Sequence, residues 1–288
     1  MSRDRVERAV FAVLRPVVIV GFLIATLLPF YAMLVLSLRP IEDLLRRPGS
    51  LAVDLSRLTL DTYVDVLRPV AEGGQGFLGL VGNSAVVATA SVVVALLIAV
   101  PGAYAVSRLD FFGRRHVSSL FLVVYLFPAI VLAIPLFVLL TQMQLRGSLV
   151  GLVLVYIAQT VPVAIYMLKN YFATIPASVE EAGLVDGLGR VGVIRRISLP
   201  LALPSVVATG TFVFMIAWNE FLFALLFLVE RRDRWTVSLG LAQLSGSIEV
   251  PTTVLMAGSV VITLPVVLLF FLTERLLSQG LTSGAEKG

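Results

Sequence analysis

The chain has 288 residues, of which 58% are hydrophobic and only 14% are charged, and its mean hydropathy is +0.99. A soluble domain carries roughly 25% charged residues, so this chain could not cover a water-facing surface and must have the bilayer as its solvent. The absence of cysteine excludes disulfides, thiolate metal sites and cysteine nucleophiles, and the single histidine, His116, excludes a histidine-rich metal cluster. The net charge of +4 fits arginines that flank membrane spans and does not require a nucleic-acid partner.

A membrane-spanning helix needs about 20 mostly apolar residues, because a rise of about 1.5 Å per residue must cross a core of about 30 Å. Six stretches meet or nearly meet this length. They run over about 16–38, 77–104, 117–140, 149–172, 201–228 and 253–272. The first stretch is too long for the apolar part of a signal peptide, so we expect a retained span. The predicted fold class is therefore an all-α membrane protein with six transmembrane helices.

The distribution of Lys and Arg predicts the orientation of these spans. If the N-terminus lies in the cytoplasm, most of the 22 Lys and Arg residues fall on cytoplasmic segments, as the positive-inside rule requires. We therefore predict a cytoplasmic N-terminus over residues 1–15, a transmembrane domain over 16–276 and a cytoplasmic C-terminal tail over 277–288. Both termini are expected inside.

Prolines lie inside several of the predicted spans. They are Pro29, Pro101, Pro128, Pro135, Pro162 and Pro265. Each removes an amide donor and kinks its helix unless neighbouring groups satisfy the freed carbonyl. Kinked helices suit a translocation pathway better than a simple anchor, although proline is also commoner in membrane helices than in soluble ones.

The segment between the fourth and fifth predicted spans has a composition unlike that of the spans. Pro176 ends the incoming chain, Ser178 is placed as an N-cap, and Glu181 three residues later completes a capping box. Gly187 then favours the end of this short helix. The sequence therefore predicts a capped cytoplasmic helix within a loop over residues 173–204.

A second helical segment is predicted from about Arg190 to Ser198, ending at the Leu199-Pro200 step. Six charged residues keep the whole loop out of lipid, namely Glu180, Glu181, Asp186, Arg190, Arg195 and Arg196. The residues alone leave two interpretations open. The displayed helix can dock into a groove on a partner protein, or it can lie as an amphipathic helix on the membrane surface.

The run EEAGLVDGLGRVGVIRRISLPLALP resembles the EAA loop of permease subunits of ABC importers. That family pattern is E-A-A-x-x-D-G, a spacer, and then I-x-L-P-x-x-x-P. The matching positions are Glu181, Ala182, Asp186, Gly187, Ile197, Leu199, Pro200 and Pro204. Gly183 replaces the usual second alanine, a change that loosens a helix by up to ~1 kcal/mol. Three further runs, YAVSRLDFFGRR, AWNEFLFALLF and the tail GLTSGAEKG, resemble the carbohydrate-uptake branch with maltose-type permeases.

This resemblance implies that the loop is a coupling helix, which docks into a cleft on a separate ATP-hydrolysing subunit. The implied contact residues are Glu180, Glu181, Ala182, Gly183, Asp186, Gly187, Ile197, Leu199 and Pro200. The tail residues Gly284 and Lys287 are implied to reach the same subunit. The implied partners are a second homologous permease, an ATP-binding subunit dimer, an extracytoplasmic solute-binding protein and the lipid of a bacterial cytoplasmic membrane.

The chain contains no G-x-x-x-x-G-K-[S/T] phosphate-binding loop, so it is not expected to hydrolyse ATP. It also lacks the H-E-x-x-H and G-x-S-x-G motifs of metalloproteases and hydrolases. We therefore expect a transporter subunit that is not an enzyme and binds no cofactor, with ATP and Mg on the partner.

Asn219 and Glu220 lie within the fifth predicted span. An acid at mid-membrane costs roughly 2.5–3.5 kcal/mol on insertion scales, so Glu220 is expected to face the protein interior or a wet cavity. Asn219 and Glu220 would line the solute pathway or the interface with the second permease. Alternatively, Glu220 would make a structural hydrogen bond to a neighbouring helix. Asn83 and Ser84 are expected to N-cap the second span, and Trp218 and Trp235 are expected to anchor at the membrane interface.

The predicted function is the uptake of a disaccharide or oligosaccharide by an ATP-driven, binding-protein-dependent importer. One alternative is an ABC permease for a polyol phosphate, an amino acid or a peptide. A self-contained secondary transporter is the other, but it would need more intramembrane acids and usually an internal repeat, neither of which the sequence provides.

Overall fold

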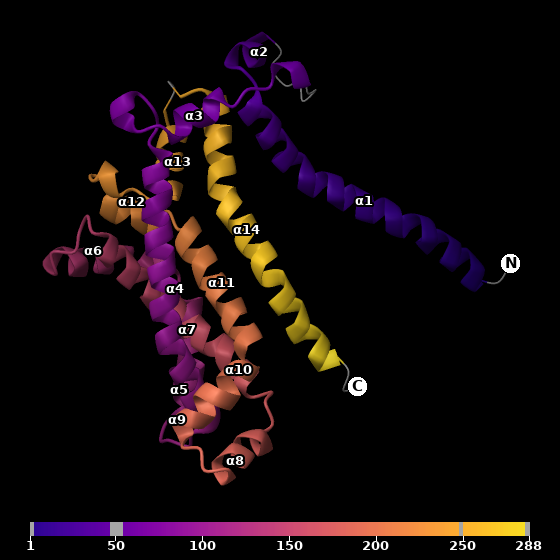
Figure 1. Cartoon of the computed structure of the whole chain (residues 1–288), viewed down its shortest axis with the longest axis vertical. Coiled ribbons are helices and arrows are strands. Elements are labelled where there is room, and N and C mark those ends of the chain that lie inside the picture. The colour runs from indigo at the N-terminus through magenta and orange to yellow at the C-terminus, as the bar shows by residue number, and fades with distance from the viewer. Residues whose placement is uncertain (1–2, 47–53, 248–249, 286–288) are drawn as a thin grey trace. The chain divides into compact units, whose positions relative to one another are not determined.

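The computed structural model of the chain describes residues 3–46, 54–247 and 250–285 (Figure 1). Every regular element in these ranges is a helix. The α-helices are α1 (Arg3–Leu38), α2 (Ile41–Arg46), α3 (Asp61–Leu67), α4 (Phe77–Arg108), α5 (Arg114–Leu126), α6 (Ala133–Gln142), α7 (Leu149–Phe172), α8 (Ala177–Val185), α9 (Arg190–Val193), α10 (Leu199–Leu201), α11 (Leu203–Asn219), α12 (Leu222–Leu228), α13 (Val237–Ser245) and α14 (Thr252–Ala285). Short 3₁₀ turns η1 (Leu55–Arg57), η2 (Val70–Glu72), η3 (Ala129–Leu132) and η5 (Arg232–Arg234) and the π-helix η4 (Ile194–Ser198) complete the elements.

The chain divides into two compact units. The first comprises residues 1–77 and 243–263, and the second comprises 78–242 and 264–288, so that α14 begins in one and ends in the other. In the first unit, the hydroxyls of Ser37 and Tyr63 lie 2.7 Å apart and join the end of α1 to α3. The most apolar stretch of α1 has no buried residue, so this helix requires lipid or another chain around it.

Four described helices are long and apolar enough to cross a membrane, namely Phe11–Leu38 of α1, α4, α7 and Thr252–Glu274 of α14. A fifth is obtained if Arg190–Leu201 and Leu203–Asn219, which meet at an angle of 76°, count as one bent span. The other predicted stretches are broken. Within 117–140, helix α5 stops at Leu126, because Pro128 offers no amide donor and holds Phe127 in an extended conformation.

The core of the second unit lies where α4 packs against α7 and α11. Ala95, Ala99 and Ala103 recur every fourth residue on α4 and are fully buried. Such a stripe of small residues lets helix backbones approach closely in a membrane, where association depends on packing. Half of the most apolar stretch of α7 is buried, against 28% for α4, so α7 is the central helix of this unit.

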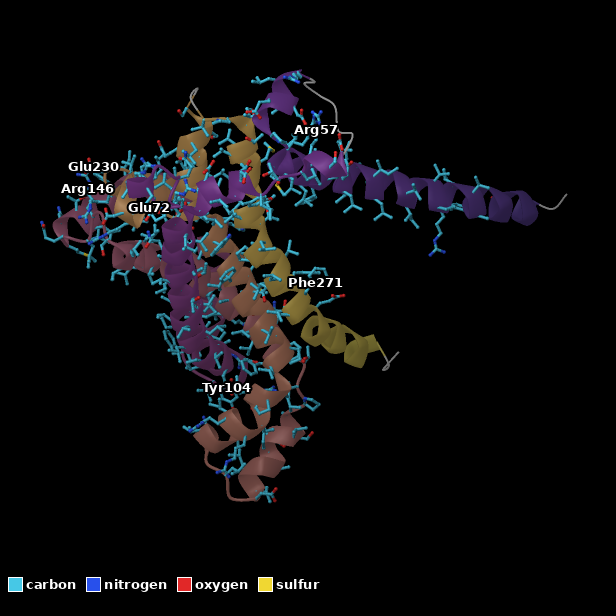
Figure 2. All side chains as sticks on the ribbon, turned by 45° about the horizontal axis from the view of Figure 1, so that its top comes forward. Arg57, Glu72, Tyr104, Arg146, Glu230 and Phe271 are labelled. Carbon is cyan, nitrogen blue, oxygen red and sulfur yellow. The ribbon has the colours of Figure 1, made fainter. Side chains whose placement is uncertain are left out.

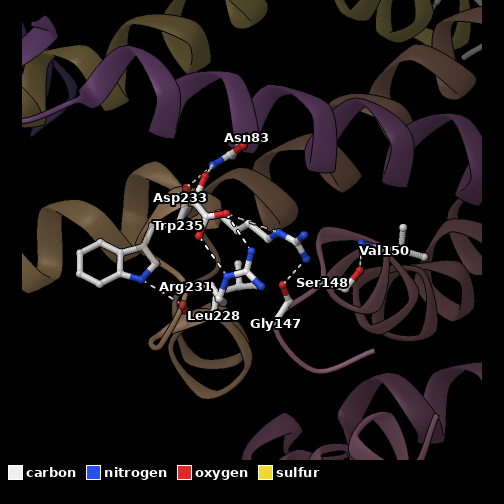
Figure 3. Close-up of polar contacts among 9 residues, drawn as sticks. Asn83, Gly147, Ser148, Val150, Leu228, Arg231, Asp233 and Trp235 are labelled. Carbon is white, nitrogen blue, oxygen red and sulfur yellow. Dashed lines mark hydrogen bonds and ion pairs between the residues drawn. The ribbon is translucent and has the colours of Figure 1, made fainter. Parts of the chain in front are cut away.

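The first turns of α4 are held by the loop that follows α12 (Figure 3). Asn83 donates from Nδ2 to the backbone carbonyls of Asp233 and Trp235, both at 3.0 Å, and the Ser84 hydroxyl accepts from the Val237 amide at 2.8 Å. The expectation that Asn83 and Ser84 cap this span is therefore wrong. The helix begins earlier, at Phe77, because no helix-breaking residue separates Phe77 from Asn83 apart from tolerated glycines.

Trp218 is only 1% exposed and stacks on Phe214, with ring centroids 5.4 Å apart. The expectation that it anchors at the membrane interface is also wrong. Its large apolar ring is instead used to fill the core beside α11.

Candidate functional site

The loop between α7 and α11 carries the predicted coupling residues. Helix α8 begins at Ala177, directly after Pro176, whose backbone (φ −59°) precedes the helix without any side-chain cap. The predicted capping box of Ser178 and Glu181 is therefore wrong. Ser178 already belongs to the first helical turn, where its side chain is past the position from which an N-cap accepts amide protons.

The carboxylate of Glu180 is the buried centre of this loop. Its Oε1 accepts from Ser198 Oγ at 3.0 Å and from Arg108 Nε at 3.1 Å, and its Oε2 accepts from the Tyr104 hydroxyl at 3.1 Å. A buried carboxylate is tolerated only when it is paired and hydrogen-bonded. We call Tyr104, Arg108, Glu180 and Ser198 the Glu180 cluster, and its contacts satisfy that requirement from α4, α8 and η4.

Two further contacts extend the cluster to the end of α7. The Arg108 guanidinium donates from Nη2 to the Ile175 carbonyl at 2.5 Å, in the turn that precedes α8. The Tyr104 ring packs edge-on against Phe172, the last residue of α7, at 5.8 Å between centroids. Figure 2 shows Tyr104 at the end of α4 nearest the loop. These contacts hold α8 against the ends of two apolar helices, α4 and α7.

Gly183 provides the close contact between the two halves of the loop. A Cβ atom at this position would overlap the terminal methyl group of Ile197 and would touch Leu188 and Val193 at 3.5 Å. Gly183 is therefore buried between α8 and η4, and its lack of a side chain permits their approach. This contact outweighs the cost of glycine in helix propensity, the one effect that can be predicted from the sequence.

Helix α8 ends next to Gly187, as the sequence predicted. Gly187 adopts a left-handed conformation (φ +85°) and its amide donates to the Leu184 carbonyl at 3.1 Å. This is the geometry that favours glycine after a helix, since a side chain at positive φ is strained. The chain then turns into α9.

The second helical segment of the loop does not end at the Leu199-Pro200 step, so the predicted end of this segment is wrong. The helix continues through η4 and α10 and bends by 76° into α11. In η4 the Leu199 amide donates to the Ile194 carbonyl, five residues back. This wider turn accommodates the ring of Pro200, which would clash with the carbonyl four residues earlier in a regular α-helix.

The remaining surface of the loop is turned outward. Val185 is 85% exposed and Val191 70% exposed, and Val179 and Leu184 are also exposed. The loop also exposes five charged residues, namely Glu181, Asp186, Arg190, Arg195 and Arg196. A surface that exposes both apolar and charged side chains is typical of a protein-docking surface.

The predicted coupling residues therefore divide between two faces. Glu181, Ala182, Asp186, Gly187 and Pro200 are exposed, Ile197 and Leu199 are half-buried, and Glu180 and Gly183 are buried. Sequence reasoning missed Tyr104, Arg108 and Ser198 as parts of the site. The sequence offered no signal for them, because packing against other elements decides which of the two adjacent acids is buried and must be paired.

Asn219 and Glu220 lie at a break between α11 and α12. The Glu220 carboxylate accepts from the amides of Phe223 and Ala224 at 2.8 and 3.1 Å, and the Tyr156 hydroxyl on α7 donates to it at 2.7 Å. The Glu220 side chain thus satisfies two amides in the first turn of α12 and links this helix to α7. Asn219 is exposed and donates to the Met215 carbonyl at 2.9 Å.

The structure places Gly284 in the last turn of α14, whereas Lys287 lies outside the described residues. Within the described part of the chain, no group of three or more His, Cys, Asp or Glu side chains could hold a metal ion.

The family model and the similar proteins all identify this chain with the same family of transporter components. The family described as "Binding-protein-dependent transport system inner membrane component" matches residues 91–282. The inner membrane ABC transporter permease protein YcjP of Escherichia coli (strain K12) is 39% identical over 93% of both chains. The trehalose transport system permease protein SugB of Mycobacterium tuberculosis is 34% identical over 98% of this chain and 99% of its own. The trehalose/maltose transport system permease protein MalG of Thermococcus litoralis is 35% identical over 92% and 93%.

Two solved structures share the fold. A chain of a bacterial ABC transporter involved in the import of the acidic polysaccharide alginate superposes with a TM-score of 0.80 at 21% identity, covering 96% of this chain and 98% of that chain. The inward-facing MetNI methionine ABC transporter gives a TM-score of 0.56 at 19% identity over 77% of this chain and 99% of that chain. The fold is that of an ABC importer permease.

Proposed function

The chain belongs to the family of inner membrane components of binding-protein-dependent transport systems, and we propose that it is the permease subunit of an importer for a disaccharide or oligosaccharide. The relatives that support a sugar are named for trehalose, for trehalose and maltose, and for arabinooligosaccharides. A permease of this family is a transport component and not itself a catalyst. The alternative is a permease for another solute. It is supported by a relative named for sulfoquinovosyl glycerol, which is 35% identical over 72% of this chain.

The observation that carries the coupling role is the Glu180 cluster. It fixes an exposed helix, α8, to the last turn of α4 and to the end of α7. A partner that grips the exposed face of α8 would therefore move these apolar helices with it, because the contacts between them are buried and polar. We propose that the partner is an ATP-binding subunit dimer, which holds the ATP and Mg, and that Glu181, Ala182, Asp186 and Gly187 contact it.

We propose six spans, with α5–α6 and α11–α12 each crossing as a broken helix. Interrupted helices are tolerated at membrane depth where protein covers the free backbone groups, as the Glu220 carboxylate does for α12. The distribution of Lys and Arg supports cytoplasmic termini, a cytoplasmic loop over residues 173–204, and insertion in a bacterial cytoplasmic membrane. The unburied stretch of α1 leaves a surface for lipid or for a second homologous permease.

The docking proposal is tested by charge reversal on the exposed face of α8. The Glu181→Arg/Asp186→Arg double variant should assemble in the membrane but lose ATPase stimulation by the loaded solute-binding protein, in nanodiscs that contain all subunits. Glu72→Arg, an exposed acid that precedes α4, is the matched control and should retain stimulation. Unchanged stimulation and uptake in the double variant would overturn the docking role.

The substrate is tested separately, by a ligand screen on the solute-binding protein that co-purifies with the complex. Binding of a disaccharide or oligosaccharide supports the proposal, and selective binding of an amino acid, peptide or polyol phosphate contradicts it. Solute uptake by the purified chain alone in proteoliposomes would replace it with a secondary transporter.

A further inference from the structure

We propose that the turn between α4 and α5, together with α7, forms a binding site for the phosphate headgroup of an anionic phospholipid. This turn is the part of the run YAVSRLDFFGRR that follows Arg108, and the proposed transport function assigns no role to it. The proposal does not depend on the direction of insertion, because anionic headgroups meet the ends of spans at either membrane surface.

The site is an open groove of about 830 Å³ where three elements meet. The lining includes Arg114, Arg115 and His116 from the start of α5, Lys169 from the last turn of α7, and Asp110 and Phe111 from the turn. Three permanent cations therefore face one acid. A groove with this excess of positive charge is complementary to a phosphate group.

The single acid of the groove is already engaged. Arg114 donates from Nη1 to Asp110 at 2.8 Å, and its Nε and Nη2 donate to the carbonyls of Val106 and Ser107 at 2.8 and 2.7 Å. Arg114 thus shapes the turn and neutralises Asp110. Arg115 and His116 are exposed, and no acid of the described residues forms an ion pair with either. The charge of Arg115 and the ring N–H of His116 remain available to a ligand.

The depth of the groove selects a lipid over a soluble phosphate compound. Arg108 ends the apolar helix α4, and Lys169 lies in the last turn of the apolar helix α7, so the groove lies at the level where both leave the hydrocarbon. Basic pockets between membrane helices at this level bind anionic headgroups. In Figure 1 α5 begins at the same end of α4 as the loop that carries α8.

Exposed aromatic side chains flank the charges. Phe112 is fully exposed and Phe111 is 41% exposed, in the same turn, and Leu120 and Val123 on α5 are exposed as well. Water is a poor environment for such surface, whereas the boundary between headgroups and acyl chains would bury it. The groove and these side chains together match the two parts of a phospholipid, its phosphate and its acyl chains.

The test uses the assembled transporter in nanodiscs of phosphatidylcholine with added phosphatidylglycerol or cardiolipin, followed by native mass spectrometry of retained lipid. We expect anionic lipid to be retained preferentially, and the Arg115→Gln/His116→Gln variant to reduce this retention at least several-fold. Arg68→Gln, an exposed arginine that precedes α4, is the matched control and should retain lipid as the unmodified protein does. Equal retention in the groove variant would overturn the proposal.

A second measurement leaves the charges in place. In Phe112→Trp, fluorescence should be quenched by brominated phosphatidylglycerol more than by brominated phosphatidylcholine, after subtraction of the two native tryptophans. Addition of millimolar inorganic phosphate tests whether the groove binds free phosphate instead of a lipid headgroup. Quenching that does not depend on the headgroup, or anionic lipid that free phosphate displaces completely, would contradict a phospholipid site.

Discussion

The guanidinium of Arg108 lies 3.1 Å from the carboxylate of Glu180, and the two side chains are only 16% and 10% exposed. This ion pair joins the last turn of the apolar helix α4 to the first turn of α8, across 72 residues of sequence. Removal of one partner from a buried pair costs about 3–5 kcal/mol, because the other charge stays buried without compensation. The pair therefore makes the position of α8 depend on the end of α4.

Glu180→Gln tests this dependence, since it keeps the size of the side chain and removes its charge. We expect amide hydrogen exchange in residues 177–185 to become about tenfold faster or more, because local opening reflects the lost pairing energy. Hydrogen-exchange mass spectrometry of the assembled complex would measure it.

Glu181→Gln is the matched control, because it makes the same chemical change on the exposed neighbour. In complexes that retain the ATPase subunit, exchange in α8 should stay unchanged in that variant, although fewer complexes retain the subunit. If both variants gave the same exchange, Glu180 would not hold the loop.

Gly183→Ala sets two effects against each other. Alanine should stabilise α8 by up to ~1 kcal/mol through helix propensity, but its Cβ would overlap the terminal methyl group of Ile197. Overpacking typically costs about 1–3 kcal/mol, so we expect net destabilisation of the loop by about 1 kcal/mol. Thermal unfolding of the detergent-purified complex, followed by loss of ATPase subunit binding, would detect it.

Two companion variants make the Gly183 result specific. Gly183→Ala/Ile197→Val removes the clashing methyl group and should recover the loss. Gly192→Ala, where a Cβ would have only ordinary contacts with Leu188 at 3.5 Å, should be neutral or stabilising. A Gly183→Ala single variant more stable than the native chain would contradict the close packing.

The long apolar helices could be predicted from sequence, because length and hydropathy alone decide them. Pro128 predicted a kink, but the complete breaks could not be predicted. Phe127 to Pro128 interrupts one predicted span and Glu220 divides another, and in each case the freed backbone groups are satisfied by local contacts that hydropathy does not encode. Cap positions were misplaced for a related reason, since Ser178 has the right chemistry but Pro176 decides where the helix starts.

The family motif contains only one of the two adjacent acids of α8, and it is the exposed one. Glu181 matches the family pattern, yet Glu180 is the acid that the fold buries. Helix α8 has only nine residues, too few for its own periodicity to show which face turns inward. Its orientation is decided by Tyr104, Arg108 and Ser198, which lie far away in sequence or in the next helical segment.

The loop between α12 and α13 gives a prediction on pH. Hydrogen bonds from the Arg231 guanidinium hold the pKa of Asp233 below its usual value, and both side chains are exposed. A depressed pKa means that this contact stabilises the loop above the unfolded-state pKa of Asp, and that the contribution is lost as pH falls through the folded value. Hydrogen exchange of residues 229–236, corrected for intrinsic rates, should therefore stay constant from about pH 7 to pH 5.

Asp233→Asn provides the comparison for that experiment. It keeps the backbone carbonyl that Asn83 contacts and removes the titrating group. Protection of the loop should fall slightly at neutral pH and should lose its dependence on pH in the acid range. A transition near pH 6 in the native chain would instead show that another group controls this loop.

Glu220→Ala separates the structural role of this acid from a role in the solute pathway. The variant removes the acceptor for two amides of α12, at a cost of about 0.5–2 kcal/mol for a lost cap. It also leaves the buried Tyr156 hydroxyl without its partner, at a further cost of about 1–3 kcal/mol. We expect a lower melting temperature and less assembled transporter, with Glu220→Gln intermediate because its carbonyl oxygen still accepts.

Asn219→Ala is the control for Glu220, because Asn219 is exposed and its side chain donates to the Met215 carbonyl one turn earlier in the same helix, α11. It should leave stability within about 0.5 kcal/mol of the native value, as for surface substitutions generally. The decisive measurement is the KM for solute uptake per assembled transporter. An unchanged KM in Glu220→Ala, together with reduced assembly, indicates that Glu220 holds α12 against α7. A normal melting temperature with a changed KM would place its carboxylate in the solute pathway.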